Sequence, residues 1–381
     1  MKAVCVCFEV HLPLPVRWYW PREGYGEVHI EKYFDMERAV HNFTKLEKNL
    51  ETLNDALSKS IDNGGKYTLD VSGVFLEQCQ WSPSVVDGFR KLDQECVSFA
   101  ASPYYHSVCS LFEDMDEFRQ QVQKDVETIK DKFGHQTRTF VNTELLYEQR
   151  TMEVLKDMGF KCFISEGSPN VLNGSVPMHV YDNIVPTLLR HINLSEDLEV
   201  RFLDKKWSGY PLIADKFASW IAGMEGDVIT LYIKYDAINT HLSNDPEILG
   251  FLRYLPLSLK KHNIEMVLPE EAVDMFRMKS LSSLDSMRTA RYGMHNLMGN
   301  HAQHLFINEL ADLGKQLLKV QDPVKKADLQ RIYRYLQQSE ILLEMNLEER
   351  RLGYEMAVND LLILSDIERA IIMAGKEEAT R

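Results

Sequence analysis

Residues 139–147 read TFVNTELLY, and this segment gives the clearest indication of the fold. The apolar run 139–141 ends at polar residues, and Glu144 follows within three positions. A short apolar run with such an ending is typical of a buried strand in a parallel sheet. Similar strand-like runs occur at 3–10, 68–74, 162–164, 228–233 and 265–267.

Amphipathic stretches separate these runs. Residues 39–63 and 115–133 show apolar side chains at helical spacing, and the first stretch closes at Asn63-Gly64-Gly65. Strands and helices in alternation predict parallel strands joined by helical crossovers, hence an open α/β sheet or a barrel. Because barrel active sites lie at the carboxyl ends of the strands, the residues that follow each run are the functional candidates.

The pattern changes after about residue 280. Three stretches, 296–319, 324–338 and 352–374, show apolar residues at helical spacing only. We therefore expect an α/β domain at residues 1–280 and a C-terminal α-helical bundle at residues 281–381.

Composition narrows the classes of function. The chain has 381 residues, is 45% hydrophobic and carries a net charge of -14, with no cluster of Lys and Arg, which argues against nucleic acid as a partner. No run approaches the roughly 20 apolar residues of a membrane span. The apolar run near the N-terminus is interrupted by Glu9 and His11 and is interpreted as a first strand rather than a signal peptide. We expect a cytoplasmic protein that is not associated with a membrane.

The six cysteines are scattered and show no zinc-site spacing. The sequence also lacks a nucleotide-binding fingerprint and the HExxH metal motif. No metal and no cofactor are therefore expected, and the sequence does not indicate an oligomeric state.

Five segments place polar or aromatic side chains near the end of a predicted strand. His11 could donate to a sugar hydroxyl or bind a metal, or be a structural turn histidine. Glu77 could accept sugar hydroxyls or lie at a helix N-terminus. Glu144 could be an ionised nucleophile or a first-turn helix glutamate. Trp207 could stack on a sugar ring or be buried. The fifth segment, 232–241, contains Lys234, Asp236 and His241.

Taken together and in order, these segments resemble the α-amylases of glycoside hydrolase family 57. The matching segments are 10–13, 103–107, 140–147, 214–218 and 299–300. The resemblance implies an incomplete seven-stranded parallel β/α barrel followed by a helical bundle. It also implies action on α-glucans, such as starch, glycogen or maltooligosaccharides, by a retaining route with Glu144 as nucleophile.

The chain departs from the family pattern at the site. The family's acid/base is an Asp in an Asp-Tyr-Glu motif, and the corresponding stretch here reads Lys234-Tyr235-Asp236. The family's His-Gln-Pro opening is His11-Leu12-Pro13, and a later Trp corresponds to Leu297. These differences put catalysis in question while the scaffold is retained.

Lysine at position 234 changes the expected chemistry. A retaining glycosidase sets two carboxyl groups about 5 Å apart, and the negative partner raises the pKa of the acid. An ammonium group favours ionised Glu144 but keeps its own proton, and loss of general-acid help costs roughly 10²- to 10⁴-fold in rate. Asp236 is the candidate substitute acid, since residues two apart on a strand share a face at a separation of about 6 to 7 Å.

Two hypotheses follow. The chain is a working amylase or 4-α-glucanotransferase that uses Glu144 and Asp236, or it is an α-glucan-binding protein with little or no turnover. Lys234 favours the second hypothesis. The residues expected to contact the glucan are His11, Glu77, Trp207, Lys234, Asp236 and His241.

Overall fold

The computed structural model describes residues 1–21, 28–92, 95–285, 288–346 and 350–379. It divides into two compact units. The barrel unit comprises Met1–Leu12, Asn42–Tyr104 and Arg119–Arg291, and the helical unit comprises Pro13–His41, Tyr105–Phe118 and Tyr292–Arg381. The sequence led us to expect one boundary near residue 280, whereas two earlier segments also belong to the helical unit. The composition of the sequence does not change at the bounds of these two segments.

The barrel unit is built on parallel strands. Pairings run from β8 to β1, β2 and β3, from β4 to β5, and from β5 through β7 back to β8. A parallel bridge between Ala101 and Phe140 connects the end of β3 to β4. The result is a nearly closed seven-stranded barrel, which confirms the predicted fold class. Its strands are β1 (Lys2–Val10), β2 (Tyr67–Val71), β3 (Val97–Ala100), β4 (Thr139–Val141), β5 (Cys162–Glu166), β7 (Thr187–Arg190) and β8 (Val228–Lys234).

Three short strands extend this sheet. Strand β6 (Val180–Asp182) pairs antiparallel with β7, β9 (Ile264–Met266) pairs parallel with β1, and β10 (Lys279–Ser280) pairs with β6. The sequence analysis did not identify β3, β6 or β7, which are only three or four residues long. Length alone does not account for this, because β4 and β9 are equally short and were expected from the sequence.

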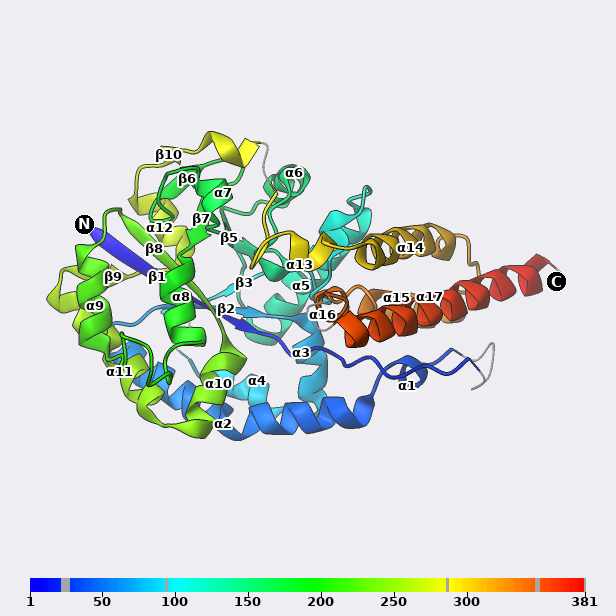
Figure 1. The fold of residues 1–381 in the computed structure, drawn as a ribbon, viewed down its shortest axis with the longest axis horizontal. Helices are drawn as coiled ribbons and strands as arrows, with labels where there is room; N and C mark the ends of the chain where they lie inside the picture. The colour runs from blue at the N-terminus through cyan, green and yellow to red at the C-terminus, as the bar shows by residue number, and fades with distance from the viewer. Residues whose placement is uncertain (22–27, 93–94, 286–287, 347–349, 380–381) are drawn as a thin grey trace. The chain divides into compact units, whose positions relative to one another are not determined.

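Helices follow most strands, and α8 packs against β8 while α11 packs against β9 (Figure 1). Helices α2 and α5 begin in segments of the helical unit and continue into the barrel unit. The helices are α2 (Met36–Asp62), α3 (Gly73–Gln78), α4 (Ser84–Arg90), α5 (Asp116–Phe133), α6 (Gln149–Asp157), α7 (Pro169–Leu172), α8 (Ile192–Glu199), α9 (Ala214–Gly223), α10 (Tyr235–Asn244), α11 (Glu247–Lys261) and α12 (Pro269–Met275).

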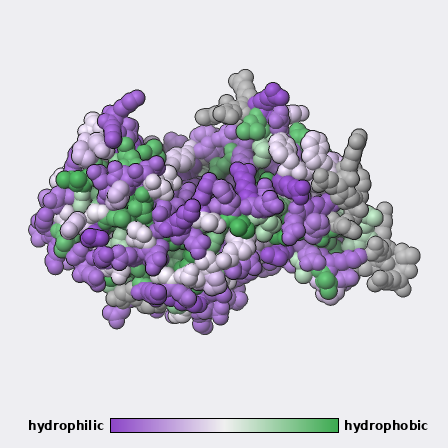
Figure 2. Space-filling model, turned by 90° about the horizontal axis from the view of Figure 1, so that it is seen from below, coloured by the Kyte–Doolittle hydropathy of each residue, from purple (hydrophilic) through white to green (hydrophobic). Residues whose placement is uncertain are grey.

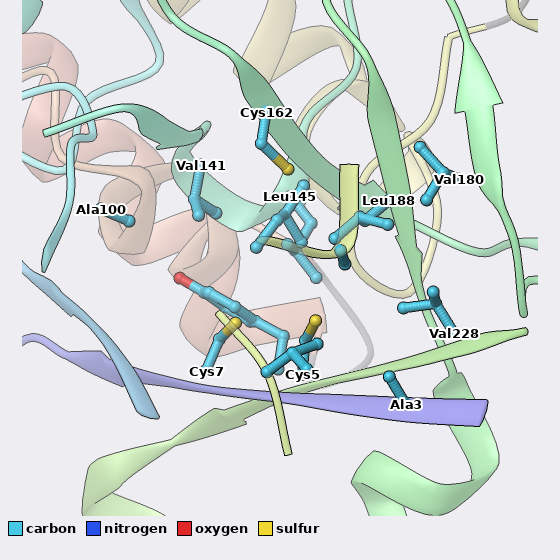
Figure 3. Packing of buried hydrophobic residues seen from close by; sticks show 14 residues of the cluster. Ala3, Cys5, Cys7, Ala100, Val141, Leu145, Cys162, Val180, Leu188 and Val228 are labelled. Carbon is cyan, nitrogen blue, oxygen red and sulfur yellow. The ribbon is translucent and has the colours of Figure 1, made fainter. Parts of the chain in front are cut away.

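The barrel interior changes from apolar to charged along the strands. Successive strand residues point to opposite faces, so Cys5 and Cys7 of β1 share one face, and Figure 3 shows them in the same buried cluster as Cys162. The same alternation places Glu9 next on the inward face of β1 and Glu166 on that of β5. Charged residues therefore gather at the carboxyl ends of the strands.

The helical unit contains the predicted C-terminal helices, and α14 packs against both α15 and α17. Helix α15 begins where Asp322 accepts hydrogen bonds from the backbone N–H groups of Val324 and Lys325. The helices of this unit are α1 (Ile30–Tyr33), α13 (His295–Met298), α14 (His301–Leu317), α15 (Pro323–Tyr335), α16 (Ser339–Glu344) and α17 (Arg350–Ala379).

The surface is largely hydrophilic on the face drawn in Figure 2, in keeping with the charge of the chain. Among the described residues, no helix combines the length and the apolar character needed to span a membrane.

Candidate active site

Glu144 lies in a strained turn directly after β4. The turn is a single 3-10 segment, Thr143–Leu145, whose first N–H donates to the side chain of Asn142. Glu144 and Leu145 both have left-handed backbones, with φ of 51° and 53°. For non-glycine residues this conformation costs on the order of 1–3 kcal/mol each, so the surroundings must hold it.

Two hydrogen bonds hold the backbone of this turn. The carbonyl oxygen of Glu144 accepts from the N–H of Arg291 at 2.7 Å, and that of Leu145 accepts from the hydroxyl of Ser165 at 2.9 Å. The Glu144 side chain is only 4% exposed. A strained, buried carboxylate at a strand end is a feature of functional sites rather than of ordinary loops.

Lys234 is the last residue of β8, and it pairs in register with Glu9 of β1. Its Nζ lies 3.7 Å from Oε1 of Glu144. Its backbone N–H donates to Oε1 of Glu199 at 2.6 Å. The Lys234 side chain is 41% exposed, so the ion pair lies where the barrel interior meets solvent.

A buried network of charges lies beside this pair. Arg291 donates to Oε2 of Glu9 and to Oε1 of Glu199, each at 2.8 Å. Arg190, at the end of β7, donates to Oε2 of Glu199 at 2.8 Å and to Oε2 of Glu166 at 3.2 Å. Arg190 is 0% exposed and Arg291 is 1% exposed. Each carboxylate of this network thus has a guanidinium partner, as buried charges require.

Arg291 links the network to both members of the Glu144–Lys234 pair. Its backbone holds the turn of Glu144, and its side chain binds the Glu199 carboxylate that accepts from the Lys234 backbone. Burial lowers the pKa of Arg291, but Glu9, Glu199 and Glu144 outweigh that effect and raise the pKa well above its ordinary value. Arg291 is therefore a fixed positive charge.

The neighbouring carboxyl groups differ in their surroundings. Burial raises the pKa of Glu166, although Arg190 opposes the shift. On β2, Asp70 accepts a hydrogen bond from the Tyr232 hydroxyl at 2.6 Å, and burial together with Asp70 raises the pKa of Tyr232 well above its usual range. The phenol consequently remains a hydrogen-bond donor.

Asp236 does not lie on a strand. Strand β8 ends at Lys234, and Asp236 stands in the first turn of helix α10 with an exposed side chain. Lys234 and Asp236 are therefore not two residues apart on one strand, and the expectation that they share a strand face is wrong.

Two other expected residues lie at opposite ends of α3, His11 beside its N-cap and Glu77 in its last turn. Nδ1 of His11 is 2.7 Å from the hydroxyl of Ser72, which caps that helix. Glu77 accepts from the Tyr104 hydroxyl at 3.0 Å and lies 3.5 Å from Nζ of Lys124. Both side chains are half-buried and held by neighbouring polar groups.

The remaining two expected residues have structural surroundings. Nε2 of His241 donates to the carbonyl oxygens of Leu198 and Glu199, and burial lowers the pKa of this histidine. His241 thereby supports the end of α8 that carries Glu199. Trp207 packs edge-on against Trp220, with ring centres 5.9 Å apart.

Sequence reasoning missed the residues that surround the pair, namely Glu9, Glu166, Arg190, Glu199 and Arg291. Glu9 offered a signal, because it continues the inward alternation of Cys5 and Cys7 in an otherwise apolar strand. The partners of Arg291 arise only when distant segments meet in the folded barrel.

Fold and site together define a class, the β/α-barrel proteins of the glycoside hydrolase type, with a buried glutamate and further carboxylates at the strand ends. The sequence model described as glycosyl hydrolase family 57 matches residues 5–285. The chain belongs to glycosyl hydrolase family 57.

One relative and two solved structures illustrate this membership. The chain is 32% identical over 351 residues to a protein of Methanocaldococcus jannaschii provisionally named an alpha-amylase, covering 88% of this chain and 75% of the relative. A family 57-type branching enzyme from Pyrococcus horikoshii matches with a TM-score of 0.69 at 13% identity, over 95% of this chain and 88% of that one. A 4-alpha-glucanotransferase from Thermococcus litoralis matches with a TM-score of 0.58 at 11% identity, over 94% and 55%. These structures show the fold.

Proposed function

We propose that this chain is an α-amylase-like protein that binds α-glucan at the strand ends of its barrel and turns it over slowly or not at all. The observation that carries the proposal is the 3.7 Å separation between Nζ of Lys234 and Oε1 of Glu144. The names of its relatives, an alpha-amylase and a 4-alpha-glucanotransferase, support starch, glycogen or maltooligosaccharide as the ligand class.

The ion pair accounts for the proposed loss of turnover. Retaining hydrolysis needs a nucleophilic carboxylate and, about 5 Å away, a carboxyl group that protonates the leaving oxygen. Lys234 supplies a positive charge that neutralises Glu144, and an ammonium group is a poor proton donor near neutral pH. Loss of general-acid help reduces the rate by roughly 10²- to 10⁴-fold.

The alternative is a fully active enzyme in which another carboxyl group donates the proton. Asp236 is the substitute that the sequence suggested. Its position in the first turn of α10, exposed and beyond the strand end, favours the impaired site over this alternative.

An α-glucosyl fluoride tests the proposal, because its leaving group needs little protonation. Wild-type protein should bind maltohexaose by calorimetry, and its kcat/KM for the fluoride should exceed that for maltohexaose by about 10²-fold or more. Glu144→Ala should abolish any turnover of the fluoride. Rapid hydrolysis of maltohexaose that Asp236→Asn removes would instead establish the substitute acid.

A cytoplasmic location is part of the same proposal. Cys5, Cys7 and Cys162 are buried free thiols in the barrel core. Thiols of this kind are usual in proteins of a reducing compartment.

A further inference from the structure

A short segment of the helical unit presents two tryptophans to solvent. Trp18 is 49% exposed and Trp20 is 65% exposed, whereas Tyr19 between them is 5% exposed. Alternation of this kind arises in an extended chain, where successive side chains point to opposite sides. Tryptophan is highly buried on average, so two exposed indoles on one side of one segment call for an explanation.

The extended conformation is held from beneath by Asn359 of helix α17. Its Oδ1 accepts from the N–H of Tyr19 at 2.7 Å, and its Nδ2 donates to the carbonyl oxygen of Arg17 at 3.1 Å. Asn359 is 2% exposed. On the other side, the N–H of Arg17 donates to the carbonyl oxygen of Tyr33. The backbone on both sides of Trp18 is therefore fixed.

Tyr19 is anchored by a buried ion pair. Its ring lies 5.9 Å from that of Tyr33, and Nζ of Lys32 lies 5.7 Å from its centre. Lys32 in turn pairs with Asp366 of α17 at 2.7 Å, and both side chains are 4% exposed. Because Tyr19 is held inward, Trp18 and Trp20 are directed outward by the fold itself.

The two indoles line a hollow of about 340 Å³, which we call the tryptophan hollow. Its volume lies at the lower end of the roughly 300–1,000 Å³ typical of ligand pockets. Its other walls include a thioether, two guanidinium groups and one carboxylate. The residues that line the hollow include Arg17, Trp18, Trp20, Asp35, Arg38 and Met356.

We infer that the tryptophan hollow binds a glucose unit of an α-glucan. One face of a glucopyranose ring carries mainly C–H groups and stacks on an indole, while its hydroxyls accept from guanidinium groups and donate to a carboxylate. Side chains of both signs suit a neutral ligand with many hydroxyls better than an ion, and the net charge of -14 disfavours an anionic polymer. The choice of α-glucan rests on the proposed function.

The test compares glycogen binding by native affinity electrophoresis. The double variant Trp18→Ala/Trp20→Ala should bind glycogen about tenfold or more weakly than wild type, as expected when two aromatic contacts are removed. Trp18→Phe/Trp20→Phe should recover part of the affinity, because phenyl rings still stack. Tyr354→Ala is the matched control, since Tyr354 is an exposed aromatic side chain of α17, 66% exposed, and it should bind like wild type.

The outcomes separate this inference from the proposed function. Equal retardation of the double variant and wild type overturns the inference, and calorimetry with maltohexaose then reports the barrel site by itself. Turnover of α-glucosyl fluoride that depends on Glu144 but is unchanged in the double variant shows that the barrel site is intact. If wild type is not retarded by glycogen at all, the tryptophan hollow does not bind α-glucan.

Discussion

The strand ends of the barrel unit and the Asp360 region of the helical unit both bury carboxyl groups, but the two regions accommodate them differently. In the barrel, Glu9 and Glu199 accept hydrogen bonds from Arg291, so each of these carboxylates is paired with a cation. In the helical unit, Asp360 is fully buried and accepts from the Asn359 side chain, and no cation within the described residues pairs with it. The strand ends of the barrel thus hold ionised carboxylates, whereas Asp360 is held in its neutral form, unlike the buried Asp366 of the same unit, which pairs with Lys32.

The largest expected effect follows from breaking the barrel network. Arg291→Met keeps most of the side-chain volume but leaves Glu9 and Glu199 without this guanidinium. Removal of one partner from a buried ion pair costs about 3–5 kcal/mol, so the free energy of unfolding should fall by that amount. Urea unfolding followed by circular dichroism measures it. A loss below about 1 kcal/mol would show that the network contributes no more than surface charges do.

In the helical unit, the contribution of Asp360 to the free energy of unfolding should depend on pH. Burial raises the pKa of Asp360 to about 8, with Asn359 opposing the shift and Glu344 adding to it. A carboxyl group with a raised pKa in the folded state binds its proton more tightly there than in the unfolded chain. Its contribution therefore destabilises the fold progressively as pH rises from about 4 to about 8.

Asp360→Asn removes that titration while keeping the shape of the side chain. The variant should be more stable than wild type at pH 8, by about 1 kcal/mol or more, and the difference should shrink towards pH 4. Urea midpoints of both proteins across this range provide the measurement. Parallel pH profiles would show that Asp360 does not titrate between these limits.

The smallest effect is expected at a surface pair of the barrel unit. Nζ of Lys66 lies 2.6 Å from Oε1 of Glu271, and both side chains are about a third exposed. Because water screens such a pair, Lys66→Ala should lower the free energy of unfolding by less than about 1 kcal/mol. This variant is the control for Arg291→Met, since each removes one cation from an ion pair. Similar losses in the two variants would remove the distinction between buried and surface charges.

The sequence predicted the alternation of strands and helices and the position of Glu144 because both depend on local patterns, whereas the seven-stranded barrel was implied by the resemblance to the family. The apolar run that ends before Glu144 is β4, and the alternation of Cys5, Cys7 and Glu9 lies within β1. Asp236 was misplaced because helix α10 begins at Tyr235 without a Ser, Thr, Asp or Asn before it to mark the start.

The contacts that hold the site in place could not be predicted from the sequence. Arg291 belongs to no periodic segment, and its contacts to Glu9 and Glu199 join positions that are distant along the chain. The left-handed backbone of Glu144 is likewise imposed by tertiary hydrogen bonds, since glutamate has no intrinsic preference for it.

The rate of maltohexaose hydrolysis by Lys234→Asp tests most directly whether Lys234 limits turnover. This substitution places a carboxyl group at the end of β8, facing Glu144, and removes the ammonium group that neutralises the nucleophile. We expect kcat to rise by about 10²-fold over wild type, and the gain to be lost in Lys234→Asp/Glu144→Ala. An unchanged kcat in a folded Lys234→Asp protein would contradict the claim that Lys234 limits turnover.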